Sequence, residues 1–194
     1  MIEHRHFALH KPYGYVSQFV SNEKKGYKAK KLGLLYDFPD GTMAIGRLDK
    51  DSEGLLLLTT DGKVSAEITS RKVEKEYYVQ LDGDIDSNAM LQLQKGIEIS
   101  IRGDKYMTKP CVAHLLKEAP LFPPRIKKIR DDRHGPTSWV SITVKEGKFR
   151  QVRKMTAAVG FPTLRLVRVR VGDISLGQMK SGEVLELQKI YTEK

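Results

Sequence analysis

Apolar residues recur along the chain in short runs of two kinds. Runs that are wholly apolar, or that alternate with polar residues, indicate strands, whereas apolar residues three or four positions apart indicate helices. The strand pattern covers residues 7–9, 15–20, 44–48, 55–58, 76–81, 97–101, 110–116, 139–144, 164–171 and 182–187. The helical pattern covers residues 64–69, 89–95 and 149–159. Many short strands with few short helices predict an α+β fold on a largely antiparallel, mixed sheet.

Turn and capping residues separate these elements. Ser87 is a good N-cap for the second helix, and Gly160 ends the third. Residues 118–137 are rich in proline and charge, which predicts a long exposed loop. A chain of 194 residues is the length of one domain, and we expect residues 1–194 to form one domain with two lobes.

The third helix and the strand after it carry many cations. At 100° per residue, Arg150, Arg153 and Lys154 share one helix face. The opposite, apolar face holds Val152, Met155 and Val159. The strand at 164–171 alternates apolar residues with arginine, which predicts that it is half-exposed. Helix and strand together are expected to present one basic surface.

Charge is the unusual part of the composition. The chain has 34 Lys and Arg against 24 Asp and Glu, a net charge of +10. Residues 145–170 have a net charge of +7, residues 125–133 one of +3, and lysines also cluster at 24–31. Such clustering favours a nucleic-acid partner, because several cations must lie along one phosphate backbone. The alternative is an ordinary solvated charged face.

Other classes of protein are excluded. A single cysteine, Cys111, gives neither a disulfide framework nor a cysteine-based metal cluster. The five histidines lack the helical spacing of a metal site, so no metal is expected. The apolar run Leu55–Leu58 is too short to span a membrane, and the N-terminus lacks the pattern of a secretory signal. We therefore expect a cytoplasmic protein without a membrane partner.

The segment from Gly46 to Gly54 is a candidate reactive loop. Arg47 and Asp49 lie two residues apart in it, directly before the buried run. Loops at strand ends commonly carry reactive groups. From spacing alone, an ordinary charged surface loop is the favoured alternative. The Gly-Lys-Ser/Thr of a phosphate-binding loop is missing.

The segment GRLDKDSEGLLLLTTDG resembles the signature of the RsuA-type pseudouridine synthases, the RsuA/RluB/RluE/RluF family. Further stretches resemble family motifs in the same order, from about residue 6 to 188: HKPYGYV, KEYYV, EGKFRQVRKM, FPTLRLVRVRVGDISL and GEVLEL. The region around EGKFRQVRKM is most similar to the RluE branch, which acts on large-subunit (23S) ribosomal RNA. Many relatives begin with a separate RNA-binding domain, and we expect none here because the chain starts at the catalytic strand.

The resemblance implies a two-lobed catalytic domain around a central cleft. It also implies isomerisation of a specific uridine in ribosomal RNA to pseudouridine, after the base is flipped out of its stack. The glycosidic bond is cut, the base turns and a C–C bond forms. Because there is no redox change and no group is lost, the resemblance implies no cofactor.

The matched motifs assign roles to individual residues. Asp49 is the implied catalytic aspartate, acting as a nucleophile or as a base, and Arg153 is its implied partner. Tyr77 is implied to stack on the uracil, although a packing role is the alternative. Arg47 and Leu166 are implied to line the substrate pocket, Arg47 by orienting the RNA; plain core is the alternative for Leu166. The phosphates of the RNA are expected to be bound by five cations: Lys148, Arg150, Lys154, Arg165 and Arg168.

A second hypothesis is an RNA-binding protein of the same fold without catalysis, such as a ribosome assembly factor. Both hypotheses explain the net charge. Only the enzyme explains why Asp49, Tyr77 and Arg153 occur together. We therefore expect a pseudouridine synthase that works as a monomer on large-subunit ribosomal RNA.

Overall fold

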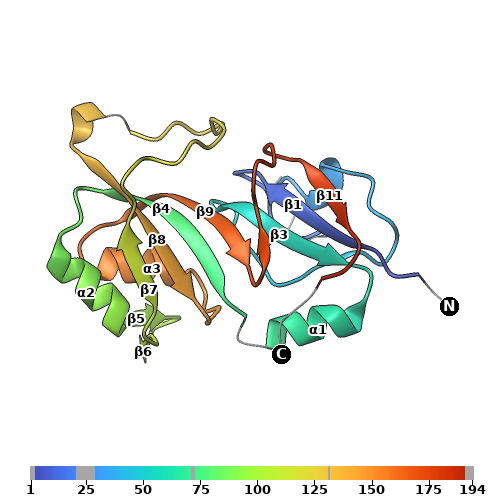
Figure 1. Cartoon of the computed structure of the whole chain (residues 1–194), viewed down its shortest axis with the longest axis horizontal. Coiled ribbons are helices and arrows are strands. Elements are labelled where there is room, and N and C mark those ends of the chain that lie inside the picture. The colour runs from blue at the N-terminus through green and yellow to red at the C-terminus, as the bar shows by residue number, and fades with distance from the viewer. Residues whose placement is uncertain (1–2, 21–28, 71–72, 131, 191–194) are drawn as a thin grey trace. The chain divides into compact units, whose positions relative to one another are not determined.

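The chain forms two units, of which the second is inserted into the first. The structure is a computed structural model that describes residues 3–20, 29–70, 73–130 and 132–190 (Figure 1). The first unit consists of Met1–Val73 and Arg168–Lys194, and the second of Glu74–Val167. Strand β9 (Thr163–Val171) therefore contributes its first residues to the second unit and its last residues to the first.

The first unit is built around two fully buried strands. Strand β1 (His6–Lys11) lies between β11 (Val184–Leu187) and β3 (Glu53–Thr59) and is antiparallel to both. The far edge of β3 pairs with the end of β9, and β2 (Met43–Ala44) also pairs with β3. Helix α1 (Gly62–Ser70) follows β3 in the chain (Figure 1). The unit also contains the short 3-10 helix η1 (Leu32–Leu34) and strand β10 (Ile174–Ser175), which pairs with β9.

The register of β1 and β3 determines where the loops of the first unit meet. Lys11, at the end of β1, lies opposite Gly54, near the start of β3. The turn that follows β1 and the loop that precedes β3 consequently lie at the same end of these two strands. This brings residues 12–17 beside residues 46–52.

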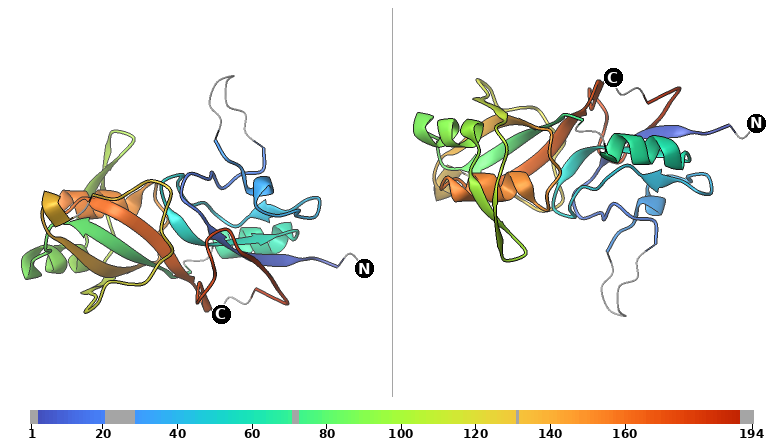
Figure 2. Two further views of the ribbon diagram at one scale, coloured as in Figure 1. Left: turned by 90° about the horizontal axis from the view of Figure 1, so that it is seen from above. Right: turned by 90° about the horizontal axis from the view of Figure 1, so that it is seen from below.

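The second unit has an antiparallel sheet with helices on one face. Strand β8 (Thr137–Val144) lies between β4 (Lys75–Asp82) and β7 (Val112–Leu115), and the first residues of β9 lie beside β4. Helices α2 (Ser87–Lys95) and α3 (Gln151–Ala158) lie on the same side of the sheet (Figure 2). The remaining elements are the hairpin of β5 (Glu98–Ile101) and β6 (Asp104–Met107) and the 3-10 helix η2 (Asp132–His134).

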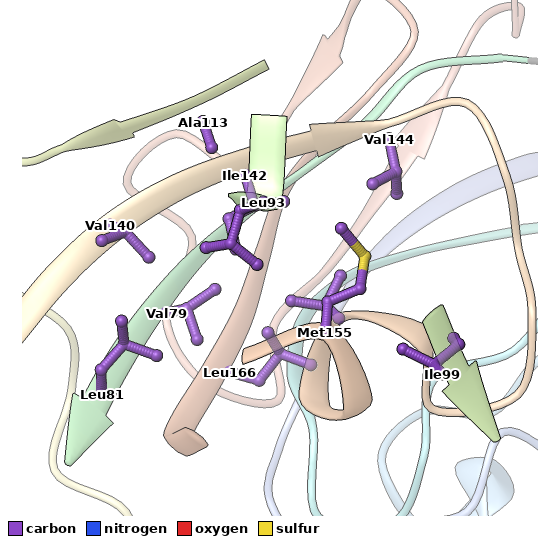
Figure 3. Close-up of a cluster of buried hydrophobic side chains, with 11 residues drawn as sticks. Val79, Leu81, Leu93, Ile99, Ala113, Val140, Ile142, Val144, Met155 and Leu166 are labelled. Atoms are coloured by element: carbon purple, nitrogen blue, oxygen red, sulfur yellow. The ribbon is translucent and has the colours of Figure 1, made fainter. Parts of the chain in front are cut away.

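The core of the second unit forms where the helices cover the sheet (Figure 3). Val79 of β4 and Ile142 of β8 point toward Leu93 of α2 and Met155 of α3, and all four side chains are fully buried. Because strand residues alternate in direction, Tyr78 and Trp139 point to the opposite face. There they pack around Phe122 of the segment 116–136, with ring centroids 6.2 and 5.9 Å apart.

The predicted α+β fold with a largely antiparallel sheet is confirmed, since every strand pair with a described register is antiparallel. The strand predicted at 15–20 does not form, because Tyr15 makes only an isolated bridge to Lys30. The strand predicted at 44–48 is reduced to β2. Asp86, one residue before Ser87, caps α2 by accepting a hydrogen bond from the Ala89 N–H at 2.7 Å.

The prediction that residues 164–171 form a half-exposed strand is wrong at the centre of β9. Four consecutive residues there, Arg165 to Arg168, are buried, so the strand is covered on both faces. Among the described residues, no helix is long and apolar enough to cross a membrane.

Candidate active site

Asp49 lies half-buried in a loop that four hydrogen bonds hold in place. The Ser17 hydroxyl donates to the Leu48 carbonyl at 2.8 Å and accepts from the Leu48 N–H at 2.9 Å. The Gly14 N–H donates to the Lys50 carbonyl at 2.8 Å, and the Ser52 N–H closes a turn on the Asp49 carbonyl at 3.0 Å. The loop is therefore held on both sides of Asp49, a residue that is itself half-buried.

Lys11 fixes the turn that supports this loop. Its side chain is completely buried, and its Nζ donates to the carbonyls of Pro12 at 3.0 Å and Tyr15 at 2.7 Å. These bonds shape the turn that carries the Gly14 N–H. The segments HKPYGYV and GRLD, separate in the sequence, are thus joined in one structure.

The environment of Lys11 is strongly charged. Burial lowers the pKa of the Lys11 amine to about 7, although Glu53 and Asp51 oppose the shift. The cation of Arg168 lowers this pKa further, and Asp49 raises it. Lys11 and Asp49 therefore interact electrostatically.

Arg168 lies inside the first unit, although the sequence predicts a phosphate contact for it. Only 5% of its surface is exposed, and its Nε donates to the Leu55 carbonyl of β3 at 2.7 Å. Glu53 is buried as well, with 3% exposed. Buried charges are tolerated when they are hydrogen-bonded and balanced by opposite charges. The buried side chains of Lys11, Glu53 and Arg168 therefore support the Asp49 loop structurally.

Three of the predicted site residues belong to elements that enclose the core of the second unit. Tyr77 of β4 points to the helix-covered face and packs against the core while staying half-buried. Leu166 of β9 is a member of that core, with 5% exposed (Figure 3). Arg153 follows the buried Val152 on α3 and is half-buried. The predicted apolar face of α3 is confirmed by the burial of Val152 and Met155.

The chain that enters α3 presents cations beside aromatic rings. Lys148 Nζ lies 4.7 Å from the centre of the Tyr106 ring, and Lys154 Nζ lies 5.2 Å from that of Phe149. Lys154 also donates to the Ser100 carbonyl at 2.6 Å. Phe149 is 57% exposed, so an aromatic ring and two ammonium groups share a surface suited to bases and phosphates.

Glu146 anchors this surface. Its carboxylate accepts hydrogen bonds from the Tyr106 hydroxyl, from the Lys109 N–H at 3.0 Å and from Gln151 Nε2 at 2.8 Å. Burial raises the pKa of Glu146, but these hydrogen bonds outweigh burial and lower the pKa overall. Arg150, at the N-cap of α3, has a left-handed backbone with φ of 52°.

Arg165 also has an internal role. It is 8% exposed, its Nη2 donates to the Pro123 carbonyl at 2.8 Å, and its guanidinium lies 5.4 Å from the centre of the Phe122 ring. It therefore fastens the segment 116–136 to β9. Of the predicted lysine cluster at 24–31, Lys24, Lys25 and Lys28 lie outside the described residues. The described residues contain no cluster of three or more His, Cys, Asp or Glu that could hold a metal.

Sequence comparison identifies the family. The sequence model of the family described as "RNA pseudouridylate synthase" matches residues 5–158. The chain belongs to this family. The matched region contains the Asp49 loop, Tyr77 and Arg153, whereas Leu166 lies beyond it.

Individual synthases of the family are similar over most of the chain. A "Ribosomal large subunit pseudouridine synthase E" of Vibrio parahaemolyticus is 41% identical over 93% of this chain and 72% of its own length. A protein of the same name from Xanthomonas campestris is 40% identical over 90% of this chain and 91% of its own. A crystal structure of a pseudouridylate synthase superposes with a TM-score of 0.73 at 33% identity, covering 97% of this chain and 72% of that one.

Sequence reasoning about the synthase site missed two supporting residues. The sequence assigns Lys11 only to the segment HKPYGYV, and it predicts only a strand at Ser17. The signal that could have found them is their position within or next to HKPYGYV, a segment that resembles a family motif and does not alternate as a strand does.

Proposed function

We propose that this protein converts one uridine of large-subunit ribosomal RNA to pseudouridine. The observation that carries the proposal is Asp49, a half-buried carboxylate in a loop fixed by Ser17 and Gly14, within the region that the family model matches. Similar proteins named as large-subunit synthases support the choice of RNA.

The reaction needs a carboxylate and a dry pocket rather than a cofactor. The bond between C1′ and N1 breaks, the uracil turns, and a bond between C1′ and C5 forms. The proton at C5 leaves and N1 gains one, so electrons and atoms balance. Asp49 acts at the sugar, as a nucleophile on carbon or as a base on a proton.

We propose that Tyr77, Arg153 and Leu166 act with Asp49 on the flipped uridine. Tyr77 supplies a ring for stacking on the uracil, and Leu166 supplies an apolar wall. Arg153 supplies the positive charge that keeps a carboxylate ionised. Arg47, exposed and two residues before Asp49, orients the RNA.

The surface around α3 is proposed to bind the RNA backbone through Lys148, Arg150 and Lys154. Arg165 and Arg168 are proposed to support the fold beneath the binding surfaces, in keeping with their burial. We further propose that the protein works as a monomer in the cytoplasm. A molar mass of about 22 kDa in light scattering is the expected result for the monomer.

Mapping pseudouridines in large-subunit ribosomal RNA tests the function. RNA from cells lacking the gene is compared with RNA from cells that express the wild type, Asp49→Asn or Asp40→Asn. Asp40 is an exposed carboxylate of the same unit and serves as the control. One pseudouridine should be absent without the gene and with Asp49→Asn, and present with the wild type and Asp40→Asn. An unchanged pseudouridine map in the deletion strain contradicts the proposal and favours an RNA-binding protein without catalysis.

A further inference from the structure

A groove of about 400 Å³ opens on the first unit next to the Asp49 loop. Gly46 and Arg47 of that loop form part of its wall, together with residues 17–20 and 42–44. Ser65 and Thr69 of α1 complete it. Two groove residues have roles described above: Arg47 is proposed to orient the RNA, and Ser17 holds the backbone of Leu48.

The lining has the chemistry of a nucleotide site. Among the described residues that line it, Arg47 is the one charged side chain and none is acidic. Phe19 offers an aromatic ring, while Val20 and Met43 expose 76% and 37% of their surfaces. The rest of the lining includes the hydroxyl residues Ser17, Thr42, Ser65 and Thr69 and the amide of Gln18. A cation for phosphate, a ring and apolar groups for a base, and a polar side chain such as the Gln18 amide for the base edge are what single-stranded RNA requires.

The aromatic wall of the groove is held in place from behind. Phe19 packs edge-on against Phe38, with ring centres 5.3 Å apart and planes at 80°. Phe38 packs in turn against Phe7, at 5.5 Å and 88°, and Phe7 is a fully buried residue of β1. The ring is therefore ordered before a ligand arrives, which lowers the entropic cost of stacking on it.

Ser17 connects the groove to the catalytic loop. It lines the groove, and its hydroxyl makes both hydrogen bonds to the backbone of Leu48, the residue before Asp49. Arg47 lines the groove and lies two residues before Asp49. Consecutive Cα atoms are about 3.8 Å apart, so the wall of the groove at Arg47 lies close to Asp49. That spacing suits a neighbouring nucleotide on the same RNA strand.

We propose that this groove binds the unpaired base of a nucleotide next to the target uridine, with Phe19 as the stacking ring and Arg47 at its phosphate. The proposal rests on the proposed function, because it requires a uridine at Asp49. It assigns part of the sequence preference of the synthase to residues 17–20, β2 and α1.

Two matched substitutions on α1 test the position of the groove. Ser65→Glu places a carboxylate in the groove, whereas Ala66→Glu places the same charge on an exposed residue of that helix that does not line it. With a transcript of the ribosomal RNA segment around the mapped uridine, Ser65→Glu should raise KM about tenfold and leave kcat unchanged. Ala66→Glu should leave both constants near the wild-type values. Equal effects of the two substitutions would overturn the proposal.

Abasic RNA identifies the occupant. A set of synthetic RNAs is used, each of which lacks the base at one position flanking the uridine. Each RNA is assayed with the wild type and with Phe19→Ala. For the wild type, removing the base at one neighbouring position should raise KM about tenfold, a typical effect of losing one stacked base. For Phe19→Ala, removing the same base should have no further effect.

The possible failures are distinguishable. If every abasic position affects the wild type and Phe19→Ala equally, the groove binds no base, while conversion by the wild type still supports the proposed function. If Ser65→Glu impairs the reaction only on ribosomal particles and not on naked RNA, the groove binds a protein and the inference is wrong. If the wild type converts no uridine, both proposals fall.

Discussion

Gly54→Ala should weaken the first unit through a clash that the chain cannot relieve by rotating a side chain. A Cβ atom at Gly54 would lie 2.3 Å from the carbonyl oxygen and 2.7 Å from the nitrogen of Arg168. Both atoms belong to the backbone of β9, which pairs with β3 at this point. The φ angle of Gly54 is +102°, a conformation that residues with a Cβ rarely adopt.

The magnitude follows from two contributions. Backbone strain at such an angle costs about 1–3 kcal/mol, and forcing extra volume into a packed interior costs about 1–3 kcal/mol. Together they lower the free energy of unfolding by roughly 2–6 kcal/mol, a large share of the roughly 5–15 kcal/mol of a typical domain.

Gly41→Ala is the control for strain without a clash. Gly41 has a φ of +78°, and a Cβ there would meet nothing within 4 Å. Urea unfolding of the two variants and the wild type, followed by circular dichroism, gives the three free energies. Gly54→Ala should be the less stable variant by about 1–3 kcal/mol. If the two variants lose the same stability, β3 and β9 do not approach each other as closely as described.

Three further substitutions test contacts described above. Lys11→Met removes an amine whose pKa is about 7 in the folded protein against 10.5 in the unfolded chain. The unfolded wild type binds the extra proton between those values, so wild-type stability should rise from about pH 7 to 10, and the variant should lack that rise in urea titrations. Glu146→Gln should cost about 1–3 kcal/mol at neutral pH, because three donors lose a charged acceptor. The difference from the wild type should vanish as the pH falls through the lowered pKa of Glu146, and a constant difference would contradict this explanation. Phe122→Ala should speed proteolysis within residues 116–136, whereas Leu121→Ala, at a fully exposed residue, should not.

The sequence predicts best where periodicity reflects burial on one face only. The apolar face of α3 is of this kind, and Val152 and Met155 are buried as expected. The alternation in β9 is misleading, because Arg165 and Arg168 are buried and satisfy their guanidinium groups on backbone carbonyls. Periodicity reports polarity, and it cannot show that a long cation will find acceptors inside the protein.

Contacts between residues far apart in the sequence are the second kind of feature that the sequence pattern does not predict. Residues 15–20 have a strand-like composition, yet the Ser17 hydroxyl forms its hydrogen bonds with Leu48, which is 31 positions away. Nothing local indicates that partner. Lys11 is similar, since a lysine at the end of a strand is normally exposed, and its burial is tolerable because the Tyr15 carbonyl and the acidic loop lie close to it. The motif that contains Asp49 was recognisable from the sequence, but the contacts that hold it were not.

The insertion of residues 74–167 between the two parts of the first unit has a consequence during synthesis. Strand β1 and the Asp49 loop leave the ribosome early, but β9 and β11, which complete their sheet, are made last. The second unit is continuous in sequence and can form while the first still lacks Arg168 and its second edge. A nascent chain consequently carries its basic α3 surface before its carboxylate loop is supported. Truncation before residue 168 should therefore leave the second unit able to fold, while it removes β11 and the Arg168 end of β9 from the first.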